Sequence, residues 1–143
     1  RKSTPYELGL GWTVKMNKED FIGKRALQLS QKPKWQFVGI EIDWESLEKH
    51  YQKFGLAPGI PHTASRMSTP LFHDNNQIGY VTSSTWSPIL KRYIALAHVK
   101  SEYSQEGTQF DFELKVEHFR KLTSAKVVQT PFFNPERKRS CPQ

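Results

Sequence analysis

The sequence predicts a mainly β protein, an antiparallel barrel with one or two short helices, and three observations support this prediction. Apolar and polar residues alternate over 108–116, so that Phe110, Phe112, Leu114 and Val116 share one face. From residue 70 onward, short β-like runs are separated by turns. Aromatic residues make up 13% of the chain and fall mostly at alternating positions, as core residues do in strands. Short strands joined by turns are typical of a barrel or sandwich.

The first elements are turn-rich. Gly9 and Gly11 permit a close backbone approach or a positive φ. Asp20 is placed to cap a helix from Phe21 to about Gln31, and Pro33 ends it. The apolar face of this helix is formed by residues at i, i+4 and i+7: Ile22, Ala26 and Leu29.

A strand and a second helix follow. Residues 37–42 have the composition of a strand, and Asp43 opens a helix that Gly55 ends. The apolar face of this helix carries Trp44, Leu47, Tyr51 and Phe54. The next residues, 55–70, contain three prolines and are expected to form a long loop.

The remainder is expected to be β structure. A turn at 74–76 follows Leu71-Phe72, and the further strands are predicted over 77–83, 93–99, 108–116 and 122–129. Pro131-Phe132-Phe133 closes the fold, and the residues from Asn134 onward are expected to be a disordered basic tail.

Composition limits the class of protein. The 143 residues correspond to one domain, or to one domain with part of another, and the missing initiator methionine suggests a piece of a longer protein. The net charge of +7 favours anionic partners in general. No apolar run approaches the roughly 18 residues of a membrane helix, so no membrane partner is expected. A single cysteine, Cys141, excludes an internal disulfide framework and fits a reducing compartment. We expect a cytoplasmic location, or the mitochondrial matrix in a eukaryote.

Catalytic and metal-binding motifs are missing from the sequence. It contains no glycine-rich phosphate loop, no His-Glu-x-x-His and no Gly-x-Ser-x-Gly, and its five histidines lack metal-ligand spacing. The acidic pair Glu45 and Glu48 lies on a predicted helix face, where acids are ordinary. The basic residues are scattered except for 137–139, which argues against a nucleic-acid partner. Residue by residue, the chain has the character of a binding domain, with no catalytic residue and no metal site assigned.

Four stretches in a fixed order carry a family resemblance. They are Thr4–Val14 followed by Asp20–Lys24, then Gly79–Pro88, then Ile94–Val99, and finally Ala125–Val128 with Pro131–Phe133. Together they resemble the C-terminal part of the glycine cleavage T-protein (aminomethyltransferase) family over about residues 3–133. The Trp-Ser-Pro variant at 86–88 and Leu90-Lys91-Arg92 look more like the dimethylglycine and sarcosine dehydrogenase branch.

The resemblance implies a C-terminal β-barrel of the aminomethyltransferase type over 33–133. Residues 1–32 would be the end of an N-terminal folate-binding body, and 134–143 the tail. The implied function is tetrahydrofolate-dependent one-carbon transfer from an aminomethyl-lipoyl carrier protein or another amine substrate. The family's catalytic aspartate lies upstream of this chain, so we expect no activity from this chain alone.

The resemblance also suggests folate-binding residues. Glu7 matches the family glutamate on the pterin ring, whose adjacent amino and N–H groups suit a carboxylate. Arg66 matches a junction arginine facing the folate carboxylates. Trp86, expected in a turn facing the cavity, is suited to pack on the aminobenzoate ring. Tyr6 is a weaker candidate because it neighbours Glu7.

Other functions stay open on this evidence. The chain could be a non-catalytic folate- or RNA-binding module of the same fold, or the folate lobe of an N-methyl amine dehydrogenase. The sequence departs from the family motifs at Leu8, where alanine is usual, and at Ser84, where glycine is usual. These departures bear on the substrate more than on the fold.

Overall fold

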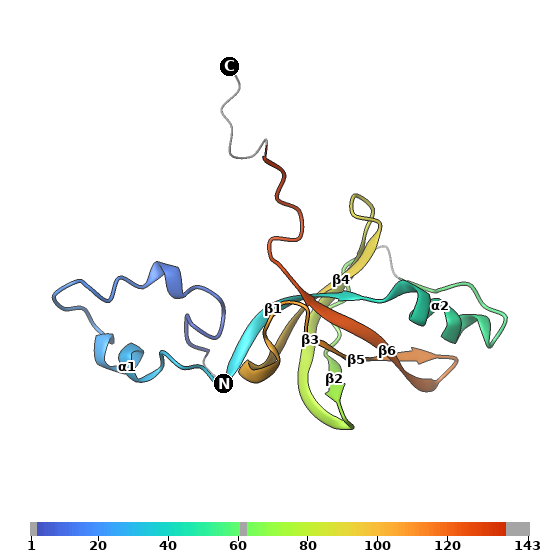
Figure 1. Ribbon diagram of the computed structural model, residues 1–143, viewed down its shortest axis with the longest axis horizontal. Helices are drawn as coiled ribbons and strands as arrows, with labels where there is room; N and C mark the ends of the chain where they lie inside the picture. The colour runs from blue at the N-terminus through green and yellow to red at the C-terminus, as the bar shows by residue number, and fades with distance from the viewer. Residues whose placement is uncertain (1–2, 61–62, 137–143) are drawn as a thin grey trace, which may run out of the picture.

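The computed structural model describes residues 3–60 and 63–136, and its centre is a closed antiparallel barrel (Figure 1). Six strands close in the order β1-β4-β3-β2-β5-β6. Their bounds are β1 Trp35–Ile42, β2 Thr69–His73, β3 Asn76–Ser87, β4 Arg92–Lys100, β5 Gln109–Val116 and β6 Phe119–Val128. The predicted fold class is therefore confirmed. The strands lie within the 33–133 assigned to the barrel domain, and that division remains a prediction.

Strand β1 closes the barrel because it pairs on both edges. It is antiparallel to β4 along its whole length, from Trp35 opposite Lys100 to Ile42 opposite Tyr93. On its other edge it pairs with β6 over Gly39–Ile42. By contrast, β2 and β5 pair only at Leu71–Phe112 and Phe72–Asp111. The β2–β5 seam is therefore the weakest part of the barrel wall.

The interior follows the predicted alternation. On β5, Phe110, Phe112, Leu114 and Val116 are all buried, as the period of two requires. The inward residues of β4 include Ala95 and Ala97, whose small side chains leave room for larger neighbours. The β5–β6 hairpin turns at Glu117 and His118, both with positive φ, as a two-residue hairpin loop of the preferred type requires.

The second helix covers one end of the barrel. Helix α2 spans Trp44–Gln52, and the Asp43 side chain accepts the Ser46 backbone N–H at 3.0 Å, which confirms the predicted cap. Leu47 and Tyr51 are buried on its apolar face. The remaining members of that face are less buried: Trp44 packs at the edge of the core, and Phe54 stacks on Phe119 near the tip of the β5–β6 hairpin.

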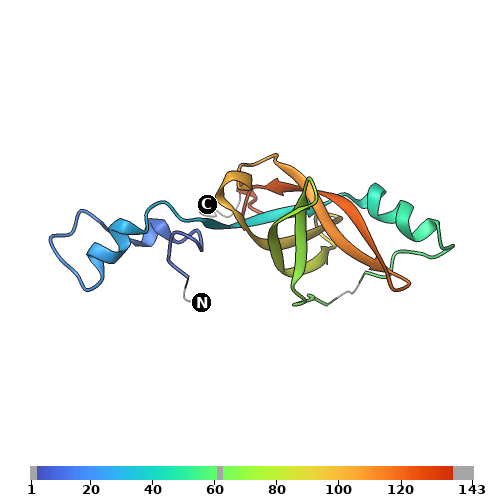
Figure 2. The same ribbon diagram turned by 90° about the horizontal axis from the view of Figure 1, so that it is seen from below.

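The first helix is shorter than predicted. Helix α1 covers only Lys24–Leu29 instead of 21–31, and the expected apolar face does not pack. Ile22 is fully exposed and Leu29 is 83% exposed. Residues 3–34 extend away from the barrel at one end of β1, whereas α2 lies at the other end (Figures 1 and 2). The periodicity thus correctly indicated a helix, but its apolar side chains find no described partner.

The strand that follows the turn at 74–76 is longer than predicted. We expected 77–83, but β3 continues to Ser87 through a register shift between Val81 and Ser83. Trp86 consequently lies in a strand and not in a turn, opposite Tyr93 of β4. The predicted turn is confined to the residues between Ser87 and Arg92.

The closing segment packs on the outside of β1. A Cβ atom added at Gly39 would lie 2.9 Å from the Phe132 ring, so the absence of a side chain at Gly39 admits that ring. This agrees with the prediction that 131–133 closes the fold. Most of the predicted disordered tail, residues 137–143, lies outside the described residues.

Gly79 offers a test of the barrel packing. A Cβ at this position would collide with the His98 carbonyl oxygen of β4, which is backbone and cannot move aside alone. We expect Gly79→Ala to lower the free energy of unfolding by about 1–3 kcal/mol, measured by urea denaturation. Gly59→Ala is the matched control, since its nearest neighbour is Tyr51 Cε1 at 3.9 Å. Equal stabilities of the two variants would contradict the packing argument.

Candidate functional site

Trp86 lies beside α2 at one end of the barrel. Its ring and that of Trp44 are 4.8 Å apart between centroids and inclined by 57°. Both rings are partly buried and pack on the core. The exposed portions of the two indoles form an aromatic surface where β1 passes into α2.

Arg66 directly follows a backbone bridge between its loop and β3. Ser65 and Ser84 exchange two hydrogen bonds, in which the Ser65 N–H donates to the Ser84 oxygen at 2.8 Å and the Ser84 N–H donates back at 3.0 Å. The next residue, Arg66, is exposed. Because the bridge is antiparallel, the chain runs from Ser65 to Arg66 in the direction opposite to that from Ser84 to Trp86. The bridge thus fixes the loop against β3, with Arg66 and Trp86 on opposite sides of it along that strand.

Glu7 lies in the N-terminal segment and is only 8% exposed. Its Oε2 accepts the Thr4 backbone N–H at 3.0 Å, and the Glu7 N–H donates to Thr4 Oγ1 at 3.3 Å. This reciprocal pairing is the arrangement that closes the first turn of many helices. The Phe37 N–H donates to the Glu7 carbonyl at 2.9 Å and ties the turn to β1.

Tyr6 packs against the glycine pair of the same turn. A Cβ at Gly11 would lie 2.9 Å from Tyr6 Cδ1, so the glycine permits the close approach that the sequence predicted. Gly9 has a φ of 71° and takes up the left-handed conformation. The Tyr6 hydroxyl is buried without a hydrogen-bond partner among the described residues, and it is therefore an unsatisfied polar group.

Two of the predicted folate residues, Glu7 and Trp86, lie at opposite ends of β1. Glu7 is bonded to Phe37, near the start of the strand, and Trp86 packs on Trp44, beyond its end. The strand from Phe37 to Ile42 alone spans about 16 Å. The structure thus places Tyr6 and Glu7 in one turn, but it does not gather all four residues in one compact pocket.

A cavity that the sequence does not predict lies beside the Ser65–Ser84 bridge. Its volume is about 210 Å³, and two buried tyrosines and a buried serine line it: Tyr51, Tyr93 and Ser84. The Ser84 and Tyr93 hydroxyls are 3.0 Å apart and share a hydrogen bond. The signal in the sequence is Tyr93, which faces inward among the small residues of β4, but a mostly apolar strand predicts core packing and not a cavity.

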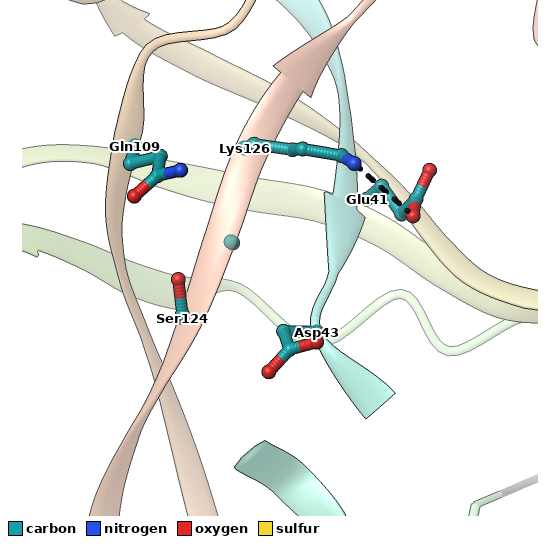
Figure 3. A pocket seen from close by; sticks show the side chains of 6 residues that line it. Glu41, Asp43, Gln109, Ser124 and Lys126 are labelled. Carbon is teal, nitrogen blue, oxygen red and sulfur yellow. Dashed lines mark ion pairs between the residues drawn. The ribbon is translucent and has the colours of Figure 1, made fainter. Parts of the chain in front are cut away.

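A polar pocket of about 300 Å³ lies on the outer face of the β1–β6 seam (Figure 3). Lys126 reaches from β6 to Glu41 on β1 at 3.6 Å, and Arg92 also pairs with Glu41. Asp43 is engaged in capping α2. Gln109, Ser124 and Ala125 complete the lining. Since these carboxylates already have cationic or backbone partners, the pocket is best explained as reinforcement of the seam.

Two absences hold for the described part of the chain. No group of three or more His, Cys, Asp or Glu side chains within 3–60 and 63–136 is arranged to hold a metal ion. Among the same residues, no helix has the length and apolar character needed to cross a membrane.

Comparison with known proteins decides the family. Residues 36–134 match the model described as the glycine cleavage T-protein C-terminal barrel domain. The chain belongs to the glycine cleavage T-protein family. The matched residues are those of the closed barrel with its Pro131–Phe133 segment. The resemblance noted in the sequence is thereby confirmed for the family.

The relatives carry the name aminomethyltransferase. The chain is 37% identical over 134 residues to the aminomethyltransferase of Prochlorococcus marinus (strain NATL2A), an alignment covering 92% of this chain and 30% of that protein. Identity to the Bacillus subtilis aminomethyltransferase is 38%, with coverages of 93% and 32%. The aminomethyltransferase T structure from Bartonella henselae superposes with a TM-score of 0.68 at 25% identity, over 91% of this chain and 32% of that one. The chain thus spans about a third of these T-protein relatives.

The phenol of Tyr51 is expected to make stability depend on alkaline pH. Burial, assisted by the neighbouring Tyr93, raises the pKa of Tyr51 above 10.0, although a hydrogen bond with the Gly59 backbone partly offsets this. A raised folded-state pKa contributes stability below pH 10, which is lost as pH rises through the folded pKa. We expect wild type to lose stability above pH 10 more steeply than Tyr51→Phe, measured by urea unfolding at several pH values. Exposed Tyr80→Phe is the control and should retain the wild-type slope.

Proposed function

We propose that this chain is the barrel domain of a tetrahydrofolate-dependent aminomethyltransferase. The observation that carries the proposal is the match of residues 36–134 to the T-protein barrel, together with 37% identity to an aminomethyltransferase across 92% of the chain. Within this function, the barrel binds and orients folate, and the transfer itself belongs to the whole protein. A lipoyl carrier protein is the proposed one-carbon donor, and the net charge of +7 suits an acidic carrier or an anionic folate.

Arg66 and Trp86 fit one part of folate. The aminobenzoyl-glutamate portion of that molecule is an aromatic ring joined to carboxylates. An exposed guanidinium recognises a carboxylate with two parallel hydrogen bonds, and a partly exposed indole packs on an aromatic ring. The Ser65–Ser84 bridge supports this assignment because it anchors the Arg66 loop to β3, the strand that carries Trp86.

Glu7 and Tyr6 fit the pterin end less directly. One Glu7 oxygen already accepts the Thr4 N–H, so a pterin contact at this carboxylate would add to that bond or replace it. The unsatisfied Tyr6 hydroxyl is a polar atom that a ligand or water would satisfy. Only an elongated ligand reaches from Glu7 to Trp86, and folate, with its three parts joined in a row, is elongated.

Folate binding is tested by isothermal titration calorimetry of the protein with tetrahydrofolate. We expect Arg66→Ala to weaken binding about 10- to 100-fold, because a hydrogen-bonded charge contributes about 1.5–3 kcal/mol. Arg66→Lys should recover only part of that loss, since lysine lacks the planar fork. Glu7→Gln should weaken binding by a comparable factor while preserving the side-chain shape.

Arg25→Ala is the control, because it removes the same charge from an exposed site on α1. Equal losses of affinity in Arg25→Ala and Arg66→Ala would show that Arg66 acts only through the net charge of the protein. That result would contradict direct recognition of the folate carboxylates by Arg66. Absence of folate binding by wild type would limit the family likeness to the fold and favour a binding module for another ligand.

A further inference from the structure

The cavity lined by Tyr51, Ser84 and Tyr93 opens where the barrel wall is weakest. Strands β2 and β5 pair only around Leu71 and Phe112, so the start of β2 and the end of β5 part beyond this point. The cavity is lined from both strands, by Thr69 and Pro70 on one side and by 112–115 on the other. A route therefore leads from the barrel interior to solvent through this gap.

The walls of the cavity are aromatic and its depth is apolar. Phe112 meets Tyr93 edge to face, with centroids 6.2 Å apart and planes at 85°. Leu114 and Tyr51 are also buried there, and Ile60 packs on the same core. An apolar cavity of about 150 Å³ holds one benzene ring. The volume of about 210 Å³ therefore accommodates a single ring with one small substituent.

Polar groups are placed at the two ends of this space. On the buried side, the Ser84–Tyr93 hydroxyl pair keeps one O–H that is not used in their mutual bond. On the exposed side, Met67, Ser68 and Lys115 form the rim. Glu113 is paired with Arg120 at 3.8 Å, whereas Lys115 has no ion pair among the described residues. The open end of the cavity thus carries the positive charge of Lys115, and its inner walls are aromatic.

We propose that this cavity binds a small aromatic carboxylate with a single ring, as a site separate from the proposed folate contacts. The ring packs against Tyr51 and against the contacting pair of Tyr93 and Phe112, and the carboxylate faces Lys115 at the rim. A polar substituent opposite the carboxylate would reach the Ser84–Tyr93 pair. Neither Arg66 nor Trp86 lines the cavity, so the assignment does not depend on the folate proposal.

The experiment is a titration of the ¹⁵N-labelled chain with benzoate and 4-hydroxybenzoate, followed by amide chemical shifts. We expect saturable shifts confined to residues near 59–60, 65–70, 84, 93 and 112–115. The 4-hydroxy compound should bind more tightly than benzoate, because its phenol reaches the hydroxyl pair. Benzamide, which has the same shape without the charge, should bind about threefold more weakly than benzoate, as expected for one partly screened charge pair.

Variants separate the proposed roles of the two ends. Lys115→Gln should weaken benzoate binding about threefold and remove its preference over benzamide. Lys49→Gln, on an exposed part of α2 away from the cavity, is the matched control and should leave both affinities unchanged. The double variant Ser84→Ala, Tyr93→Phe removes both hydroxyls and should abolish the advantage of 4-hydroxybenzoate over benzoate, with unchanged benzoate affinity showing that the cavity remains intact.

Three results would overturn the proposal. They are shifts that do not saturate, shifts spread over the surface instead of the cavity, and equal effects of Lys115→Gln and Lys49→Gln. None of these results bears on tetrahydrofolate binding, which is measured through Arg66 and Glu7.

Discussion

The double pairing of β1 is the constraint on which the rest of the structure depends. A strand that is hydrogen-bonded on both edges cannot slide, because a shift of one residue would turn Val38, Ile40 and Ile42 out of the core. The same strand carries Gly39 on its outer face, where the Phe132 ring packs. Through β1, the register of the sheet fixes where the N-terminal segment leaves the barrel and where α2 begins.

The pairing between β2 and β5 is weak, in contrast to the extensive pairing of β1 on both of its edges. Six strands share one interior, and β5 follows β6 along its whole length while it meets β2 only briefly. Side chains from α2 and from the loop before β2 therefore complete the wall, and Tyr51 is one of them. Because the wall is made there by side chains and not by a backbone ladder, a cavity forms at this place.

The sequence predicted those features that local periodicity determines. The alternation at Phe110–Val116 and the Asp43 cap were both correct, because each depends on residues close together in the chain. The spacing of Ile22 and Leu29 correctly predicted a helix, but these side chains are exposed. Burial requires a neighbouring surface, and the periodicity of one segment does not show whether such a surface is present. The position of Trp86 in a strand depended on a register shift in β3, and the cavity around Tyr93 depended on how two distant strands part. Neither the register shift in β3 nor the separation of β2 from β5 can be predicted from neighbouring residues in the sequence.

The division of the candidate folate residues follows from the same rigid strand. A fully paired β1 neither lengthens nor bends easily, so the distance between the turn at Glu7 and the indole pair at Trp44 and Trp86 is set by the barrel. A compact ligand bound at one end makes no contact at the other. An elongated ligand that touches both ends gains from two preformed contact points without having to order the chain between them, since the barrel has already fixed that part of the backbone on folding. Under the folate proposal, the barrel is a spacer between these two contact points, and selectivity by ligand length would follow from strand geometry.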